Sequence, residues 1–457
     1  MDSSEMSKMY IDEYISRARK AQAEFEKMSQ EEVDLAVKVI GKTVYDNAEY
    51  LAEIAVQETN MGNVPDKIAK NKQKSKIIWN SLKGKKSRGI LDTDETTGIT
   101  RIAKPMGVVA AITPCTNPIV TPMSNAMFAL KCGNAIIITP HHSSIKCSTE
   151  TVELINRELK KLGYPDYLIQ ILDQHSRENT KNLIASADVV IATGGSGVVG
   201  AAYSSGRPAL GVGAGNVQCI IDEGYDCKEA VPKIIAGRTF DYGIICSGEQ
   251  SVICSENDYD DVIEEFKANG AYVVSDKEDL EKVRNALFQD GKPNRHSVGQ
   301  SCSSIAKLAG IDMPEDTKII VVEAEGTGLT DPLGGEKMAP VIAAYKYGFR
   351  VGLLTAILSP VINHLLFAMP SGAALPIILI KSALLAGASA LAARTLKSVS
   401  LWAILGVVLS YQIIGTAFEW AFIGNFHAAV QDFRIGIPGM LIQWFGGYAL
   451  LKAIAKL

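Results

Sequence analysis

Four short, nearly continuous apolar runs constrain the fold of this chain more than any other feature. Each run is four to six residues long: Gly107–Ile112, Ala135–Ile138, Tyr167–Leu172 and Asp188–Ala192. Strands that are buried on both faces of a sheet have this composition, whereas half-exposed strands alternate with polar residues. Stretches with helical periodicity lie between the runs. The spacing therefore predicts β-α-β units in a doubly wound, Rossmann-type parallel sheet.

The regions on either side of these runs extend the α/β prediction. Residues 1–90 read as amphipathic helices, because apolar residues recur at helical spacing, as at Val33, Ala36 and Ile40. The lysine-rich stretch Lys67–Arg88 is interpreted as a solvated helix face, with attraction of a polyphosphate such as coenzyme A as the functional alternative. We predict a dinucleotide-binding domain at residues 1–225 and a second, partial α/β domain at 226–347.

Two glycine clusters follow the fourth apolar run. In the first, which begins at Thr193, Gly195, Gly197 and Gly200 match GxGxxG between a predicted strand and a predicted helix. Gly-rich backbone at the start of a helix can bind a phosphate, and a tight turn that needs glycine is the alternative interpretation. The second cluster spans residues 211–215.

Cys246 lies in a glycine-containing turn between a predicted helix, Glu229–Phe240, and a predicted strand, Ser251–Cys254. At such an element end, backbone amides can stabilise a thiolate and later an oxyanion. A structural cysteine is the alternative, and the other seven cysteines receive that interpretation. No CxxC pair and no signal peptide are seen, which predicts a reducing, cytoplasmic setting.

Four motifs resemble, in the same order, the coenzyme A-acylating branch of the aldehyde dehydrogenase superfamily, and most of all its acylating succinate-semialdehyde dehydrogenases. They are Thr113-Pro-Cys-Thr-Asn117-Pro, the glycine-rich turn at Thr193, Tyr242-Gly-Ile-Ile-Cys246-Ser-Gly-Glu-Gln and Glu336-Lys-Met-Ala-Pro340. The resemblance covers the first 347 residues. It implies interconversion of an acyl-CoA such as succinyl-CoA and its aldehyde with NAD or NADP, coenzyme A as co-substrate, and a homo-oligomer.

The resemblance also implies a role for each matching residue. Cys246 is the expected nucleophile, which forms a thiohemiacetal and then a thioester, and Asn117 is the expected oxyanion donor. The expected cofactor-binding residues are Thr113, Pro140, His141, Thr193, Gly194, Gly195, Ser196, Gly213 and Glu336. Thr139 stands where many hydrolytic members have a lysine, so the choice between NAD and NADP stays open. No metal ion and no nucleic acid are expected.

One difference from the hydrolytic members points to the acceptor. Those enzymes carry a glutamate that activates water to cleave the thioester, and Gly211 stands at that place here. Without that base the thioester awaits another acceptor, and a thiol needs less help because it ionises near pH 8.5. The resemblance therefore implies transfer to coenzyme A.

After Tyr347 the chain changes character. From Gly348 onward, basic residues outnumber acidic ones by five, and four apolar runs approach the ~20 residues of a spanning helix. These runs are Phe349–Phe367, Ala373–Ala393, Leu401–Phe418 and Ile435–Leu451. We predict an all-α segment of four transmembrane helices at 348–457, which contacts the lipid bilayer through residues 349–451 and tethers a cytoplasmic catalytic part to the cytoplasmic membrane. A soluble helical bundle is the alternative.

The tail also resembles the substrate-binding component of energy-coupling-factor transporters, in Tyr347–Pro360 and Met369-Pro370. This resemblance yields a second hypothesis, a membrane solute-binding protein with an inactive dehydrogenase relic, in which Lys381 and Glu419 pair or contact a polar solute. A gene fusion or composite reading frame is a third interpretation, because no linker rich in Gly, Pro or Ser separates the two parts.

Overall fold

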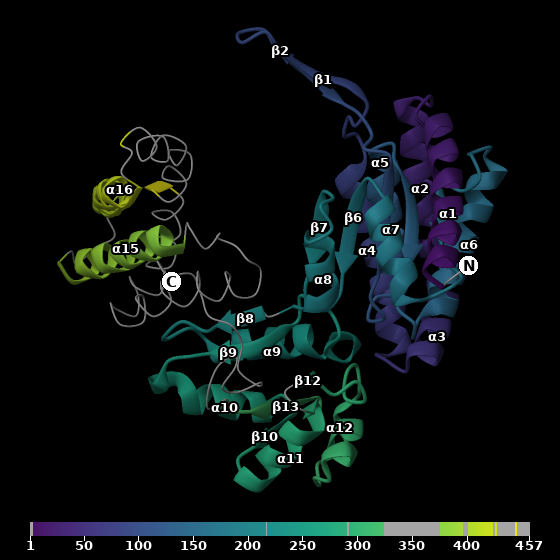
Figure 1. Ribbon diagram of the computed structural model, residues 1–457. Coiled ribbons are helices and arrows are strands. Elements are labelled where there is room, and N and C mark those ends of the chain that lie inside the picture. The colour runs from purple at the N-terminus through teal and green to yellow at the C-terminus, as the bar shows by residue number, and fades with distance from the viewer. Residues whose placement is uncertain are drawn as a thin grey trace. The chain divides into compact units, whose positions relative to one another are not determined.

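The computed structural model of this chain describes residues 3–215, 217–289, 292–323, 375–395, 401–423, 426 and 444–445. The chain divides into two compact units, Met1–Glu325 and Gly326–Leu457. Figure 1 labels their elements, and each unit is described by itself.

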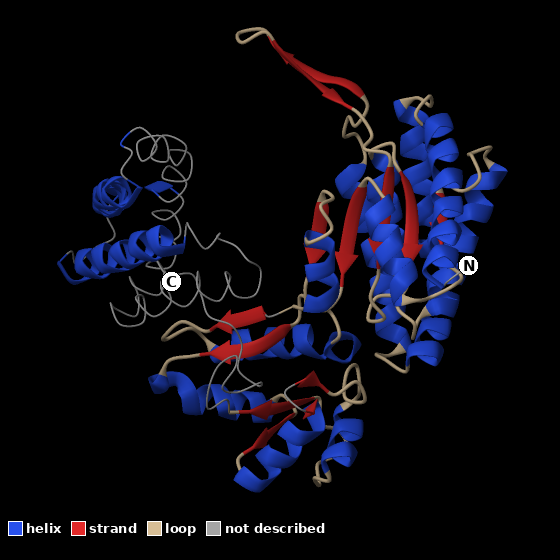
Figure 2. Ribbon diagram, viewed as in Figure 1, coloured by secondary structure: helices blue, strands red, loops and turns tan. Residues whose placement is uncertain are grey.

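A five-stranded parallel sheet organises the first part of unit Met1–Glu325 (Figure 2). Its strands, in chain order, are β3 (Val108–Ile112), β4 (Ala135–Thr139), β5 (Ile169–Ile171), β6 (Val189–Thr193) and β7 (Ala209–Val212). Their order in the sheet is β5-β4-β3-β6-β7. Every residue of β3 and β4 is buried, which is why these strands are apolar without alternation. The predicted doubly wound sheet is confirmed.

Helices cover both faces of this sheet (Figure 1). α1 (Ser3–Phe25) and α7 (Arg177–Ser186) pack together and contact β3, while α5 (Val120–Lys131) and α6 (Ile145–Lys161) contact β4 and β5. Three further helices of the predicted N-terminal helical region, α2 (Gln30–Asp46), α3 (Ala48–Thr59) and α4 (Val64–Leu82), pack on α5 and α6. The short helix α8 (Ser196–Tyr203) follows β6.

In the sequence, an antiparallel hairpin of β1 (Gly89–Asp94) and β2 (Ile99–Ala103) follows α4 and precedes β3, and it extends away from the helices and the sheet (Figure 1). The first strand of the hairpin ends at Asp94. The Asp94 carboxylate accepts hydrogen bonds from the N–H groups of Thr96 and Thr97 at 2.9 and 3.3 Å, so the turn tightens after Asp94.

The second part of the same unit contains two smaller parallel pairs. β8 (Val217–Ile220) pairs with β9 (Glu249–Ile253), and β10 (Ala271–Val274) pairs with β13 (Ile319–Val322). The remaining elements are α9 (Cys227–Thr239), η1 (Phe240–Gly243), η2 (Glu256–Asp258), α10 (Tyr259–Ala268), α11 (Lys277–Leu287), β11 (Phe288–Gln289), β12 (Lys292–Pro293) and α12 (Cys302–Ala309). The domain boundary at residue 225 and the domain extent to 347 stay predictions.

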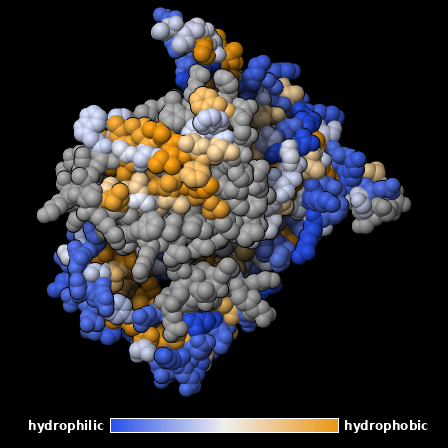
Figure 3. All heavy atoms as spheres, turned by 60° about the vertical axis from the view of Figure 1, so that its left-hand side comes forward, coloured by the Kyte–Doolittle hydropathy of each residue, from blue (hydrophilic) through white to orange (hydrophobic). Residues whose placement is uncertain are grey.

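In unit Gly326–Leu457 the structure describes two long helices, α15 (Leu375–Thr395) and α16 (Leu401–Ile423). Ile404, Val408 and Tyr411 of α16 pack with Leu384 and Leu385 of α15. Figure 3 shows apolar side chains at the surface of this pair. The two predicted spans at 373–393 and 401–418 coincide with these helices, whereas those at 349–367 and 435–451 lie outside the described residues, except for 444–445.

The transmembrane prediction is contradicted. Across the described ranges, no helix combines the length and the apolar character needed to cross a membrane. α15 contains Lys381 and α16 contains Glu419, and a charge within hydrocarbon is costly. The bilayer contact at 349–451 and the tethering to the cytoplasmic membrane fall with this prediction, and the likeness to a transporter component is not supported.

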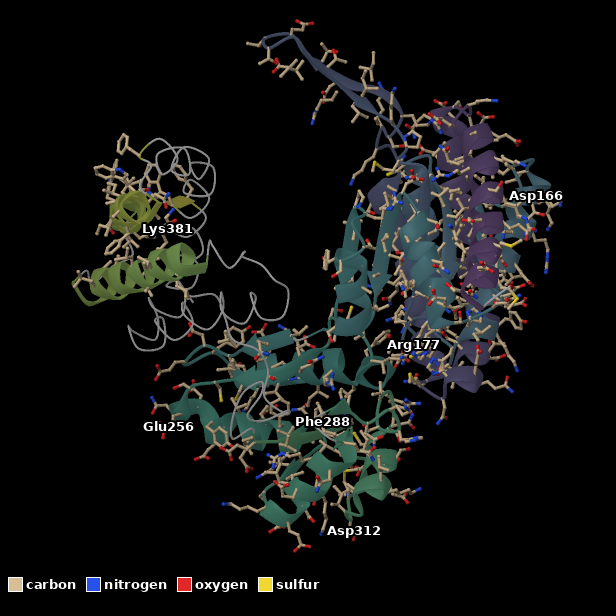
Figure 4. All side chains as sticks on the ribbon, viewed as in Figure 1. Asp166, Arg177, Glu256, Phe288, Asp312 and Lys381 are labelled. Carbon is tan, nitrogen blue, oxygen red and sulfur yellow. The ribbon has the colours of Figure 1, made fainter. Side chains whose placement is uncertain are left out.

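The Lys381 side chain packs within the helix pair. Lys381 projects from α15 (Figure 4), and a Cβ added to Gly415 of α16 would lie 2.6 Å from the Lys381 Cγ. The close contact between the lysine stem and the α16 backbone therefore requires a small residue at position 415. The side chain of Glu419, the predicted partner of Lys381, lies outside the described residues.

Candidate active site

The carboxyl ends of β3 and β6 meet where the strand order of the main sheet reverses. Doubly wound sheets bind their ligands at such a point. Thr193 ends β6 and Thr113 directly follows β3, whose last residue, Ile112, pairs with Ala192. The Thr113 Oγ1 atom is buried and has no hydrogen-bond partner within the part of the chain that the structure describes. An orphan hydroxyl at this edge fits a site that a ligand completes.

The first glycine cluster, together with Gly213 of the second, presents open backbone at the same edge. Gly195 is the N-cap of α8, with φ −70° and ψ 168°. Because glycine has no side chain, it accepts no hydrogen bond from the first N–H groups of the helix. Among the described residues, no atom lies within 4 Å of a Cβ placed on Gly195, Gly197 or Gly213. Internal packing therefore does not demand glycine at these positions, and the backbone is accessible to a phosphate.

The end of β4 carries Pro140, which is buried, and His141, which is half-buried. The His141 Nδ1 accepts a hydrogen bond from the Ser143 N–H at 3.2 Å. Burial, together with the neighbouring His142 and Arg295, lowers the pKa of His141. In the described ranges, no group of three or more His, Cys, Asp or Glu side chains could hold a metal ion.

The N-terminus of α6, which begins four residues after His141, binds the carboxylate of Glu58. Glu58 accepts hydrogen bonds from the N–H groups of Lys146 and Cys147, both at 2.8 Å. The positive end of this helix is thus already neutralised from within the protein.

Cys246 lies in the turn between η1 and β9, with its side chain exposed. A Cβ added to Gly215 would lie 2.0 Å from the carbonyl oxygen of Cys246 and 2.9 Å from its Cα. The two backbones therefore touch, and only glycine fits at position 215. On the other side Ile244, two residues before the cysteine, is buried. The turn is anchored from both sides, and Cys246 itself is exposed.

Asn117 lies in the loop between β3 and α5 and is half-buried. Within the described residues its side-chain amide donates one hydrogen bond, a long one of 3.4 Å to Thr116 Oγ1. Donor capacity therefore remains for a ligand. Cys115 in the same loop is half-buried, and burial raises the pKa of its thiol. The shared role of Asn117 and Cys246 stays a prediction, and Glu336 lies outside the described residues.

The structure shows what fills the space above Gly211. A Cβ on Gly211 would lie 2.7 Å from Tyr203 Cε2 and 2.7 Å from Val199 Cγ1. The Gly211 N–H also donates to Tyr203 Oη at 3.2 Å. Tyr203 therefore occupies the place that a side chain at position 211 would need.

Sequence reasoning missed a buried ionic cluster beside this site. Lys67 and Lys70 of α4 are 2% and 4% exposed, and both contact the carboxylate of Asp241, which is 0% exposed. The interpretation of the lysine-rich stretch as a solvated face is wrong for these two residues, although Lys72 and Lys76 are exposed as expected. The buried face of α4 consists of four polar residues at helical spacing, Lys67, Lys70, Asn71 and Ser75. This spacing indicates a buried polar face only once Asp241 is known to be the partner of the two lysines.

Comparisons with known proteins agree with the motifs. The sequence profile of the aldehyde dehydrogenase family matches residues 1–307. The succinate-semialdehyde dehydrogenase (acetylating) of Clostridium kluyveri is 55% identical over 337 residues, which cover 74% of each protein.

Two solved structures are similar to the chain. The acetylating aldehyde dehydrogenase from Geobacillus thermoglucosidasius has a TM-score of 0.70 and 39% identity, and the match covers 73% of this chain and 74% of that one. A propionaldehyde dehydrogenase from Rhodopseudomonas palustris, solved with bound CoA and an acylated cysteine, has a TM-score of 0.63 and 29% identity, with 71% and 73% covered.

Proposed function

The chain belongs to the aldehyde dehydrogenase family, in its CoA-acylating branch, and we propose that Cys246 is the nucleophile through which it interconverts an acyl-CoA and the corresponding aldehyde. The observation that carries this assignment is the anchored turn. Gly215 and the buried Ile244 fix the backbone of the turn, and the Cys246 side chain remains exposed. A nucleophile needs this combination of a fixed backbone and an accessible sulfur.

In the oxidative direction the Cys246 thiolate adds to the aldehyde carbonyl and forms a thiohemiacetal. The Asn117 amide and the Cys246 N–H stabilise the negative oxygen. Loss of the hydride leaves an acyl thioester on Cys246, and the thiolate of coenzyme A then displaces the Cys246 thiolate. The balance is aldehyde, CoA and NAD(P)⁺ against acyl-CoA, NAD(P)H and a proton.

The nicotinamide cofactor fits the edge of the sheet formed by the ends of β3 and β6. The support is the orphan Thr113 Oγ1 and the open backbone of Gly195, and Thr193, Gly194, Ser196 and Gly213 border the same edge. Pro140 and His141 are proposed to lie along the adenosine part. When bound, the cofactor supplies the hydride acceptor or donor. A His141 with a lowered pKa is uncharged at neutral pH and offers no fixed charge to a 2′-phosphate.

Coenzyme A, rather than water, is the proposed acceptor of the acyl group. Gly211 carries no base, and the Tyr203 ring takes the space that a longer side chain would enter. A thiol ionises near pH 8.5, so coenzyme A attacks the thioester without a base at that position. Succinyl-CoA is the proposed acyl-CoA, with the 55% identical Clostridium kluyveri enzyme as its support. The alternative of a solute-binding membrane protein is not favoured.

The test is NAD(P)H oxidation by the full chain with succinyl-CoA and with acetyl-CoA. We expect turnover with succinyl-CoA that Cys246→Ala lowers by about 10³-fold or more, since the covalent route is lost. Cys132→Ala is the matched control, because Cys132 is also exposed but follows the end of α5. Equal rates for wild type and Cys246→Ala would contradict the assignment of Cys246 as the nucleophile. Faster turnover of acetyl-CoA than of succinyl-CoA would contradict the proposal that succinyl-CoA is the substrate.

A further inference from the structure

A buried ionic cluster joins α4 to the chain just before Cys246. The Lys67 Nζ lies 3.1 Å from Asp241 Oδ2, and the Lys70 Nζ contacts the same oxygen. All three side chains are at most 4% exposed. None of the three side chains takes part in the proposed reaction of Cys246 and Asn117, so their burial requires another explanation.

The backbone at Asp241 is held in an unusual conformation. Asp241 and Tyr242 both have φ 52°, in the left-handed region that L-residues other than Asn and Asp rarely adopt. Hydrogen bonds fix Asp241 from two sides: its N–H donates to Asp66 Oδ2 at 2.8 Å, and its Oδ1 accepts from the Asn63 N–H at 3.1 Å. The start of α4 and this strained corner are thus one packed unit.

Gly62 shows how tight that unit is. A Cβ added to Gly62 would lie 1.9 Å from Asp241 Oδ1, and Gly62 itself has φ 70°. The turn before α4 therefore leaves no room for movement of the Asp241 carboxylate.

The cluster reaches both loops of the active site. On one side, Asp241 lies five residues before Cys246, and its carbonyl oxygen accepts a 3.4 Å hydrogen bond from the Ile244 N–H. On the other side, the charge of Lys67 acts on the thiol of Cys115, which is two residues before Asn117 in the β3–α5 loop. α4 also packs directly on α5, which begins just after that loop.

We propose that Lys67, Lys70 and Asp241 are positioning residues that hold the Cys246 turn in register with the Asn117 loop. A thiol and an oxyanion donor act on one carbonyl group only when their separation is fixed, and an error of about 1 Å costs about 100-fold in rate. The kinetic part of this inference rests on the proposed function, whereas its structural part does not.

The test uses Asp241→Asn in the full chain. Asparagine keeps the size of the side chain and tolerates the left-handed conformation, so the substitution removes chiefly the negative charge. We expect kcat for acyl-CoA reduction to fall about 100-fold while KM for NADH changes by less than about threefold, because the cofactor edge is untouched. Amide exchange at residues 242–248 should accelerate by about tenfold, with β3 and β6 unchanged.

Two further variants keep the result interpretable. Lys70→Met leaves Lys67 paired one-to-one with Asp241, so it should fold even if Asp241→Asn does not, with the same changes in smaller degree. Lys131→Met is the matched control: Lys131 is 3% exposed and paired with Asp34, between α5 and α2. It should leave both kcat and exchange at 242–248 close to the wild-type values.

Hydrogen exchange separates this inference from the proposed function, because it needs no turnover. If the wild type is inactive, accelerated exchange at 242–248 in Asp241→Asn still supports the positioning role. Unchanged exchange together with a kcat within threefold of wild type overturns it. An equal loss of kcat in Lys131→Met also overturns it, since any buried ion pair would then have the same effect.

Discussion

At the scale of single residues, the buried ionic cluster of Lys67, Lys70 and Asp241 contains two positive charges and one negative charge. Two ammonium groups share the carboxylate of Asp241, with Asp66 bound to its backbone N–H. Burial, followed by repulsion from Lys70, lowers the pKa of Lys67 to about 8. Losing one member of such a buried group is costly when it leaves a charge without a partner. Asp241 is therefore the sensitive member of the cluster, and Lys67 the tolerant one.

This titration predicts an unusual pH dependence of stability. An unfolded lysine titrates near 10.4, and Lys67 titrates at about 8 in the folded chain. Below pH 8 both states hold the proton, and the cost of burying the second ammonium is fully present. Between about 8 and 10.4 the unfolded state binds more protons, so the free energy of unfolding should rise by about 1–3 kcal/mol relative to Lys67→Met.

Urea unfolding of both proteins at pH 7, 8.5 and 10 checks this expectation. The quantity compared is the difference between the two unfolding free energies, which removes the contributions of all other titrating groups. A difference that is constant across this range would show that Lys67 does not lose its proton early.

At the scale of elements, the connection between β7 and β8 limits where the Cys246 turn can lie. Gly215 stands in this connection, and its backbone touches that of Cys246. Because the obstacle is main-chain carbonyl and Cα rather than a flexible side chain, the structure cannot make room by changing a rotamer.

Gly215→Ala should therefore displace the turn. We expect a loss of about 1–3 kcal/mol in the free energy of unfolding and a fall of about 100-fold in kcat. Gly200→Ala is the stability control, since a Cβ at Gly200 in α8 meets no described atom within 4 Å and alanine favours helix. Wild-type stability and turnover in Gly215→Ala would show that the two backbones can separate freely.

At the scale of the whole molecule, each unit has its own apolar core. The largest cluster surrounds the main sheet. Two smaller clusters are formed by residues 219–322, and all three fall within residues 1–325. The cluster of Ile404, Val408 and Tyr411 belongs to the second unit. Separate cores predict separate folding.

A fragment of residues 1–325 should consequently fold without the rest of the chain. We expect a cooperative thermal transition within about 5 °C of the corresponding transition of the full chain, because no core residue of that unit is removed. Circular dichroism and calorimetry of both proteins measure this. A fragment without a cooperative transition would show that unit Gly326–Leu457 contributes to the stability of the first.

Local pattern was sufficient for the parallel sheet and for the position of Cys246. The runs that became β3 and β4 are apolar because every residue in them is buried, whereas β5 and β6 keep partly exposed residues. Burial constrains each strand separately, so each run could be recognised by itself. The Cys246 turn was recognisable because a helix end, a glycine and a strand start lie within a few residues. The motifs that carried the family resemblance are equally local, so they could be read in order along the chain.

Tertiary structure decided what depends on contacts between distant segments. Lys67 and Lys70 lie in a stretch with the composition of a solvated helix face, yet both are buried in contact with Asp241, which follows them by more than 170 residues in the sequence. Gly215 and Gly213 look alike in sequence, yet a Cβ at Gly215 would collide with the Cys246 backbone, whereas a Cβ at Gly213 has no described atom within 4 Å. The membrane prediction was wrong for a different reason: it rested on runs of apolar residues, whereas across the described ranges no helix combines the length and the apolar character of a span, and α15 and α16 carry Lys381 and Glu419.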